Sequence, residues 1–272
     1  MSVRSVLKKI LVSPELESHM KKIPKKLGSF GYDPWGYNHD TTMISIALFK
    51  KLYDEYFRVA SYGRENIPKE GRLLIIANHS GQLPMDGVLV ALSMIFNIES
   101  PRAGRPMVER FFPSVPFVAP FLNQVGAVLG DPVNCGKMLE KEEAVIVFPE
   151  GIRGSGKVFK KRYQLQRFGN GFMHLALTYK TPIIPVGIVG CEETIPSFGN
   201  ITPLAKLLGV PYIPISIPFI LPAKVILNFG QPMNFEGNIQ REEEVTQMVE
   251  MVKKEIRALI QKGLSQRKGW FR

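Results

Sequence analysis

The chain has 272 residues, of which 45% are hydrophobic and 22% charged, a composition that excludes gross disorder. This length is sufficient for one α/β domain with helical additions. The formal net charge of +11 indicates an anionic partner: an acidic membrane surface, a phosphate-bearing substrate or a nucleic acid.

The basic N-terminal residues 1–31 contain apolar positions at helical spacing: Val3, Val6, Leu7, Ile10 and Leu11. A short amphipathic helix lying on an anionic membrane fits this pattern, and so does a solvated leader packed loosely on the domain. Residues 41–60 predict a second amphipathic helix. Its expected inner positions are Ile44, Leu48, Leu52 and Phe57. We assign residues 1–62 to a basic, membrane-associating helical region.

The first central strand is expected at residues 73–77, a continuous apolar run typical of a strand buried on both faces. His79 follows this strand, and Asp86 lies near the start of the helix expected from Pro84 to Ile95. A carboxylate that orients an imidazole at a strand end is the arrangement of a general base. The alternative is structural, with His79 capping a strand and Asp86 capping a helix.

Prolines interrupt residues 103–123, which fits either a wall for an acyl chain or an ordinary packed connection. A strand at 125–129, a helix at 134–141 and a strand at 144–148 are expected next. The last of these strands ends in Pro149-Glu150-Gly151, so two buried strands place polar residues at their carboxyl ends. In open α/β sheets, functional sites gather at this edge.

The loop after Glu150 mixes cations with aromatic side chains, which suits a nucleotide, a lipid headgroup or a solvated face. Its cations are Arg153, Lys157, Lys160, Lys161, Arg162 and Arg167, and its aromatics are Phe159, Tyr163 and Phe168. The segment 151–157 also satisfies the phosphate-loop pattern G-x-x-x-x-G-K. Val158 stands where that loop needs a hydroxyl ligand for Mg²⁺, which argues against a nucleotide triphosphatase.

The remaining elements are a helix at 169–179, a strand at 183–189, a strand at 224–229 and an amphipathic helix at 242–264. Residues 201–223 are apolar but rich in proline, which excludes a spanning helix. This stretch fits contact with the near leaflet of a bilayer, a lipid entry path or a buried irregular loop. We assign 63–238 to the α/β domain and 239–272 to a C-terminal amphipathic helix with a basic tail.

Cys135 and Cys191 are far apart in sequence and show no metal-like spacing, so we expect reduced thiols in a cytosol-facing protein. The basic N-terminus is not followed by an apolar core, so we expect no signal peptide. The sequence contains no uncharged apolar run of about 20 residues suited to a helix, so we expect no membrane-spanning helix.

Three boxes resemble those of the glycerolipid acyltransferase family, which includes the lysophosphatidate acyltransferases. Asn78-His79 with Asp86 resembles its His-Asp box, and Phe148-Pro149-Glu150-Gly151-Ile152-Arg153 matches its Phe-Pro-Glu-Gly-x-Arg box. Thr181-Pro182-Ile183-Ile184-Pro185-Val186 is similar to its later proline-flanked apolar box. The resemblance spans about residues 60–230 and implies a mixed, mostly parallel central sheet flanked by helices.

The chain departs from this family at two places. The family usually has four residues between His and Asp, whereas six separate His79 from Asp86 here. Because the five-residue step reaches Pro84, we assign the role to Asp86 and expect the intervening loop to bulge. In a further box of the family, a glycine, a short apolar strand and an arginine that meets the phosphate of the acceptor, the aligned stretch is Gly126–Pro132, with Pro132 in place of the arginine. Nearby arginines are candidate substitutes, namely Arg102, Arg105 and Arg110; otherwise the acceptor is not a simple phosphomonoester.

The resemblance implies an O-acyltransferase that moves a fatty acyl group from acyl-CoA or acyl carrier protein to a hydroxyl of a lysophospholipid or related glycerolipid. His79 would be the general base and Asp86 its orienting partner, with backbone N–H groups of the Ser80–Gly81 turn as candidate oxyanion donors. Glu150, Gly151, Arg153, Arg105 and Arg110 would bind the acceptor. The acyl-chain pocket would be formed by Ile183, Ile184 and Pro185.

The expected partners are the lipid acceptor, the acyl thioester and an anionic membrane surface, without nucleic acid. We expect no metal and no bound cofactor, and a peripheral or monotopic location on the cytoplasmic face of a membrane. Two alternatives stay open. One is an ester or thioester hydrolase that uses the same His79 with water, and the other is a non-catalytic basic lipid-binding module.

Overall fold

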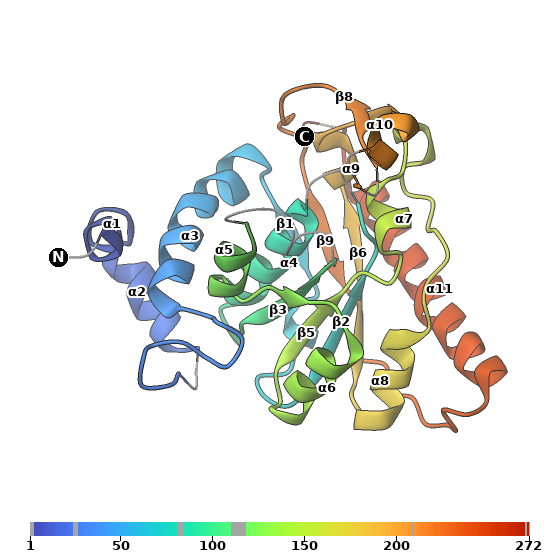
Figure 1. Cartoon of the computed structure of the whole chain (residues 1–272), viewed down its shortest axis with the longest axis horizontal. Coiled ribbons are helices and arrows are strands. Elements are labelled where there is room, and N and C mark those ends of the chain that lie inside the picture. The colour runs from blue at the N-terminus through green and yellow to red at the C-terminus, as the bar shows by residue number, and fades with distance from the viewer. Residues whose placement is uncertain are drawn as a thin grey trace.

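The chain folds around a seven-stranded central sheet in the order β1-β9-β6-β2-β5-β3-β4, seen edge-on in the computed structural model of Figure 1. The structure describes residues 3–23, 27–80, 84–109, 118–207, 209–210, 212–269 and 271. The sheet strands are β1 Ala60–Tyr62, β2 Leu73–Ala77, β3 Gly104–Val108, β4 Val128–Leu129, β5 Ala144–Val147, β6 Ile183–Val189 and β9 Ile226–Phe229. A separate hairpin is formed by β7 Ser197–Asn200 and β8 Pro214–Ser216.

Five neighbouring strands, β6, β2, β5, β3 and β4, run parallel to one another. β9 is antiparallel to β6 and parallel to β1, so the sheet is mixed but mostly parallel, as expected. Because β1 pairs with β9, residues 60–62 belong to the α/β domain rather than to the N-terminal region.

Helices cover both faces of the sheet and form three layers (Figure 1). They are α1 Val3–Leu11, α2 Pro14–Lys21, α3 His39–Lys51, α4 Met85–Ile95, α5 Val118–Gln124, α6 Pro132–Glu140, α7 Ile152–Ser155, α8 Gly171–Tyr179, α9 Cys191–Thr194, α10 Thr202–Leu207 and α11 Glu242–Gln266. Alternate residues of a strand face opposite sides, so Leu73, Ile75 and Ala77 of β2 enter one core and Leu74 and Ile76 the other.

The two cores differ in the helices that build them. Residues of α2, α3 and α4 pack into the core on one face, and residues of α6, α8 and α11 pack into the core on the other. α11 lies along β6, where Gly187 admits it: a Cβ on Gly187 would approach Leu259 atoms to 2.6 Å. The carboxyl ends of the parallel strands remain open between these layers.

The inner face of α3 differs from the expected one. Thr42, Met43 and Ile46 are buried, whereas Leu48 and Leu52 are exposed. A five-residue π-helical turn, Leu52–Tyr56, follows α3 and rotates the chain so that Tyr53 and Phe57 enter the core. Within the part of the chain that the structure describes, we find no helix that is both long and apolar enough to cross a bilayer.

Candidate active site

His79 stands two residues beyond the end of β2, on the side of the sheet that faces α4. Its neighbour Asn78 fixes the strand end, because the Asn78 amide donates to Ile188 O (3.0 Å) and accepts from Ile188 N (2.7 Å). The His79 ring lies against Phe148, with 4.8 Å between ring centroids. Its side chain is 12% exposed, so it is enclosed but still reachable.

Asp86, in the first turn of α4, lies 2.6 Å from Nδ1 of His79 through Oδ2. The carboxylate that meets His79 is therefore that of Asp86, as expected, while most of the loop expected to bulge, residues 81–83, lies outside the described residues. Burial lowers the pKa of His79. The charge and the hydrogen bond of Asp86 raise it by more than burial lowers it, so the net pKa lies above its ordinary value. With Nδ1 bound to the carboxylate, Nε2 is the nitrogen left to exchange a proton with a substrate.

Asp86 also organises the backbone around it. Oδ2 accepts a hydrogen bond from Ser80 N (2.8 Å), and Oδ1 accepts one from Gly87 N (2.8 Å). The N–H of Ser80 is thus occupied by Asp86, and its expected role as an oxyanion donor is wrong; Gly81 lies outside the described residues. Ser80 is itself buried and is not among the described residues that line the cavity beside His79.

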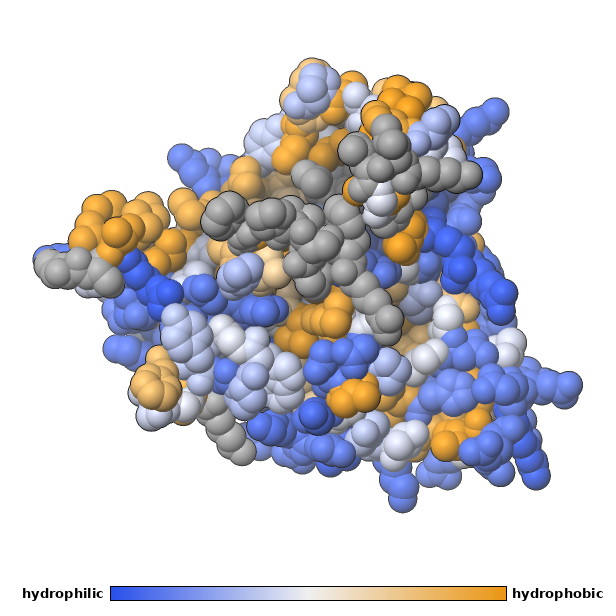
Figure 2. Space-filling model, in the orientation of Figure 1, coloured by the Kyte–Doolittle hydropathy of each residue, from blue (hydrophilic) through white to orange (hydrophobic). Residues whose placement is uncertain are grey.

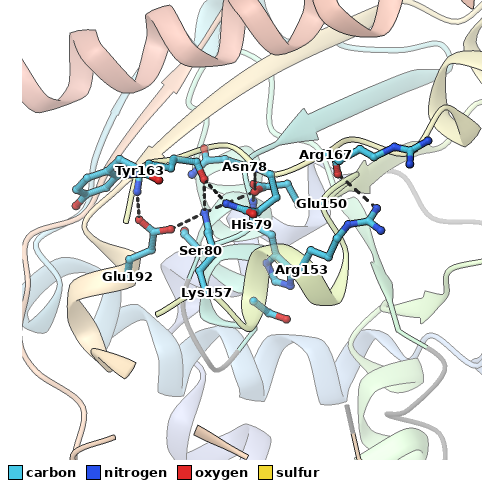
Figure 3. Close-up of polar contacts among 12 residues, drawn as sticks. Asn78, His79, Ser80, Glu150, Arg153, Lys157, Tyr163, Arg167 and Glu192 are labelled. Carbon is cyan, nitrogen blue, oxygen red and sulfur yellow. Dashed lines mark hydrogen bonds and ion pairs between the residues drawn. The ribbon is translucent and has the colours of Figure 1, made fainter. Parts of the chain in front are cut away.

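Glu150, at the end of β5, binds the backbone of the site. Its Oε1 accepts from His79 N (2.9 Å) and its Oε2 from Gln166 N (2.7 Å). The carboxylate is buried, so the expected contact with an acceptor is replaced by a contact with His79 (Figure 3). Glu150 joins the two strand ends that carry the motif residues.

Lys157 and Glu192 extend this arrangement. Lys157 was expected only as one of the loop cations that could meet a ligand, and Glu192 was not predicted as a site residue. The Lys157 ammonium lies 2.6 Å from Glu192 Oε1 and 3.6 Å from Glu150 Oε2, and all three side chains are buried (Figure 3). Lys157 lowers the pKa of His79, opposing Asp86. The lysine of the phosphate-loop pattern is therefore an internal partner of two carboxylates. In the sequence Lys157 stands among other cations and Glu192 is followed by Glu193, so neither pattern marks a buried ion pair.

Gly151, in the Phe148–Arg153 box, and Gly154, just after it, permit this packing. Gly151 has φ +53° and ψ −144°, a backbone conformation that favours glycine. Gly154 faces His79, and a Cβ there would lie 2.6 Å from the His79 Cβ and 2.7 Å from the Glu150 Cβ. The box thus holds α7 directly against the imidazole.

An apolar cavity of about 280 Å³ begins at His79 and Asp86 and runs between α3, α4, α5 and the ends of β3 and β5. One row of its lining follows α4 at helical spacing: Pro84, Val88, Ala91 and Ile95. The opposite walls include Phe49, Met107, Phe121 and Phe148. An elongated apolar ligand would fit here with one end beside the imidazole.

The expected acyl pocket at Ile183, Ile184 and Pro185 is not this cavity. These residues form the first half of β6, where they are buried between the two helical layers, and they are absent from the described lining of the cavity. Their apolar, proline-flanked sequence reflects burial in a central strand. The proline-broken stretch 103–123 instead supplies several lining residues through β3 and α5.

The expected substrate arginines have different positions. Arg105 is buried, ion-paired with Asp33 and with Glu143 (3.2 Å), and its guanidinium lies over the rings of Tyr37 and Trp35. It links the N-terminal segment to the sheet and is not available to a substrate. Arg110 lies outside the described residues.

Arg153 remains a candidate for binding an anionic group. It is exposed on α7, beside the imidazole-facing Gly154, and its described hydrogen bond is a long one to Arg167 O (3.5 Å). Figure 3 shows the Arg153 and Arg167 side chains extending away from the buried cluster. Two cations therefore stand at the rim of the site.

The family model described as Acyltransferase matches residues 58–189, the span that contains both strand ends and the cavity walls of α4 and β3. Over this span the chain is similar to the acyltransferase family. The match includes His79, Asp86, Glu150, Gly151 and Arg153.

The similar proteins extend over most of this chain. An uncharacterized protein of Mycobacterium tuberculosis is 35% identical over 214 residues, covering 75% of this chain and 59% of that protein. A bovine protein named DGAT1/2-independent enzyme synthesizing storage lipids is 30% identical over 207 residues, covering 74% of this chain and 58% of that protein. The chain therefore spans less than two thirds of the length of these relatives.

The fold is also seen in a solved structure. The crystal structure of the 1-acyl-sn-glycerophosphate (LPA) acyltransferase PlsC from Thermotoga maritima matches with a TM-score of 0.52 and 21% identity, covering 79% of this chain and 81% of that one. At this identity the likeness concerns the fold.

Proposed function

We propose that this protein is an O-acyltransferase that esterifies a hydroxyl of a glycerolipid with a fatty acyl group from a thioester donor. The observation that supports this most directly is the pairing of His79 with Asp86 at one end of the apolar cavity. The cavity suits a fatty chain, and the imidazole stands where the thioester carbonyl of that chain would lie. Acyl-CoA and acyl carrier protein both supply such a donor.

In the proposed reaction, Nε2 of His79 takes the proton of the acceptor hydroxyl as the hydroxyl oxygen attacks the thioester carbonyl. The new C–O bond forms, the C–S bond breaks, and the proton passes from the imidazolium to the leaving thiolate. Asp86 holds the ring in the tautomer that this step requires and stabilises its charged form. The protein's own groups therefore balance the reaction without a covalent intermediate.

The acceptor is inferred from the similar proteins and from the exposed cations near α7. The structural neighbour is named as an acyltransferase of 1-acyl-sn-glycerophosphate, and the bovine relative as an enzyme synthesizing storage lipids. Arg153 and Arg167 at the rim would favour an acceptor that carries a phosphate. We therefore propose a lysophospholipid or related glycerolipid, bound at a membrane surface that faces the cytosol. The two buried, free cysteines fit a reducing compartment.

The test combines the purified chain with labelled acyl-CoA and acyl carrier protein donors of several lengths and with a panel of lysophospholipids, monoacylglycerols and diacylglycerols. We expect acyl-lipid product, and we expect His79→Ala to lower its rate by about 100-fold or more. His174→Ala, at a half-exposed histidine on α8, is the control. Release of free fatty acid without acyl-lipid would instead establish a hydrolase, and full activity of His79→Ala would exclude the proposed mechanism.

A further inference from the structure

The proposed function requires a lipid acceptor, and the β7–β8 hairpin with α10 carries exposed apolar side chains beside the site. Phe198 and Phe219 are 66% and 59% exposed, respectively. Ile201, Leu204 and Ile215 are exposed in the same segment. We call these five side chains the hairpin surface. Figure 2 shows apolar residues over β8 and α10 at the top of the molecule and over α1 at its left.

The hairpin surface is held against the active-site loop. The Asn200 amide donates to Gly156 O (3.1 Å), and β7 contacts the 3₁₀ turn Phe159–Lys161. Two residues before Gly156, Gly154 packs on His79. Few residues therefore separate the exposed apolar groups from the imidazole.

The segments that form this surface and the neighbouring loop carry exposed positive charge. Residues 151–191 and 194–235 contain no aspartate or glutamate, while Lys160 and Lys161 are exposed on the turn next to β7. Glu192 and Glu193, at the base of the hairpin, are buried and paired with Lys157 and Arg267. An anionic interface would therefore meet no opposing carboxylate from these segments.

Exposed aromatic and aliphatic side chains next to lysines form a typical contact for an anionic lipid monolayer. We infer that the hairpin surface, with Lys160 and Lys161, docks on the headgroup region of an anionic membrane and turns the carboxyl ends of the parallel strands toward the lipid. This inference rests on the proposed function, because it supplies the acceptor directly from the membrane.

Vesicle sedimentation of the full chain tests the inference independently of catalysis. Ile215→Ser/Phe219→Ser and Lys160→Glu/Lys161→Glu are compared with wild type on phosphatidylglycerol–phosphatidylcholine vesicles and on phosphatidylcholine vesicles. We expect each double variant to bind anionic vesicles about tenfold more weakly or worse. The matched controls, Ile98→Ser and Lys137→Glu, change exposed residues away from the hairpin and should bind like wild type.

A second measurement locates the contact. The native cysteines are buried, so Phe219→Cys can be labelled with an environment-sensitive fluorophore and compared with Ile98→Cys. We expect the emission at position 219, and not at 98, to shift to the blue with anionic vesicles. Unchanged sedimentation of both double variants together with unshifted emission at 219 would overturn the inference and leave α1 as the membrane contact.

Acyl transfer distinguishes this failure from failure of the proposed function. If the double variants lose activity on vesicles but keep wild-type activity with donor and acceptor in detergent micelles, the docking surface is supported. If wild type binds vesicles through this surface but transfers no acyl group, the proposed reaction fails while the docking inference stands.

Discussion

His79 is held from several directions by residues that come from separate parts of the chain. Asp86 binds its ring, Glu150 binds its backbone N–H, and Phe148 covers one ring face. Since a general base contributes only when its free nitrogen is correctly placed and unprotonated, the groups that set its pKa also set the pH range of activity.

The first prediction concerns Asp86. The pKa of His79 lies above its ordinary value, so the neutral base is lost as the pH falls through that raised pKa, and activity should decline on the acid side there. Asp86→Asn removes the charge that raises the pKa while burial still lowers it. The acid limb of kcat/KM should therefore move to lower pH, and the maximal rate should fall by about 100-fold or more.

A pH–rate profile of the purified enzyme measures both effects, and circular dichroism checks the fold. An acid limb that stays in place in Asp86→Asn would show that His79 is not the titrating group.

The second prediction concerns Lys157, whose removal should move the acid limb in the opposite direction. Lys157 lowers the pKa of His79, so Lys157→Met should move the acid limb to higher pH. Because this variant leaves Glu192 without its cation, Lys157→Met/Glu192→Gln removes both charges and tests the same shift with less risk to folding. Lys137→Met, at an exposed position on α6, should leave the profile unchanged.

A shift of the acid limb to lower pH in the double variant would contradict the inference that Lys157 lowers the pKa of His79. A purely structural role would lower the rate at every pH without moving the limb.

At the level of elements, α4 combines two tasks. Its first turn carries Asp86, and the rest of its length forms one wall of the cavity, from Pro84 to Ile95. At 1.5 Å per residue this wall is about 16 Å long, which is long enough to contact much of a fatty acyl chain. The helix therefore ties the position of the proposed catalytic pair to the length of the cavity beside it.

Ala91 lies midway along this wall and gives the third prediction. Ala91→Phe should fill the deeper half of the cavity and reduce kcat/KM for the longest acyl donors by about tenfold or more, with short donors much less affected. Leu48→Phe, on the exposed side of α3, is the control. Rates measured over a series of acyl-CoA lengths test this, and an equal loss at every length would argue against an acyl chain in the cavity.

At the level of the whole molecule, the N-terminal region is fastened to the sheet through Arg105. Its guanidinium, on β3, meets Asp33 of the segment that precedes α3 and Glu143 before β5. The three groups are largely buried, so removal of the cation leaves uncompensated charges.

The fourth prediction is that Arg105→Met lowers the free energy of unfolding by about 3 kcal/mol, because breaking a buried ion pair costs that order of energy. KM for the acceptor should not change in the folded fraction. Urea denaturation and steady-state kinetics measure the two quantities. Lys254→Met, at an exposed position on α11, is the control. A raised KM with unchanged stability would restore Arg105 to a substrate-binding role.

The sequence predicts much of the sheet because its central strands are apolar on both faces. The expected strand at 183–189 coincides with β6, and those at 73–77 and 144–148 agree with β2 and β5 to within a residue. β3 was missed because Pro106 lies within it. The inner face of α3 was wrong because tertiary packing, including that of Thr42, overrode the apolar pattern.

The candidate site was predicted in part for a similar reason. Motif order brought His79, Asp86 and the second box together, but sequence spacing does not show which charged groups are buried. Glu150 and Lys157 therefore resembled substrate-binding residues although they pair inside the protein. The cavity was misplaced on β6 because an apolar run does not reveal whether it faces a void or a packed helix.

The position of Asp86 in the first turn of α4 bears on how distant relatives of this chain can be recognised. Asp86 is placed by the start of α4 and secured by Ser80 N and Gly87 N, so the number of intervening positions is free to vary. A pattern search that insists on a fixed gap between histidine and aspartate would discard this chain, whereas a criterion based on the first helical turn after the strand would retain it.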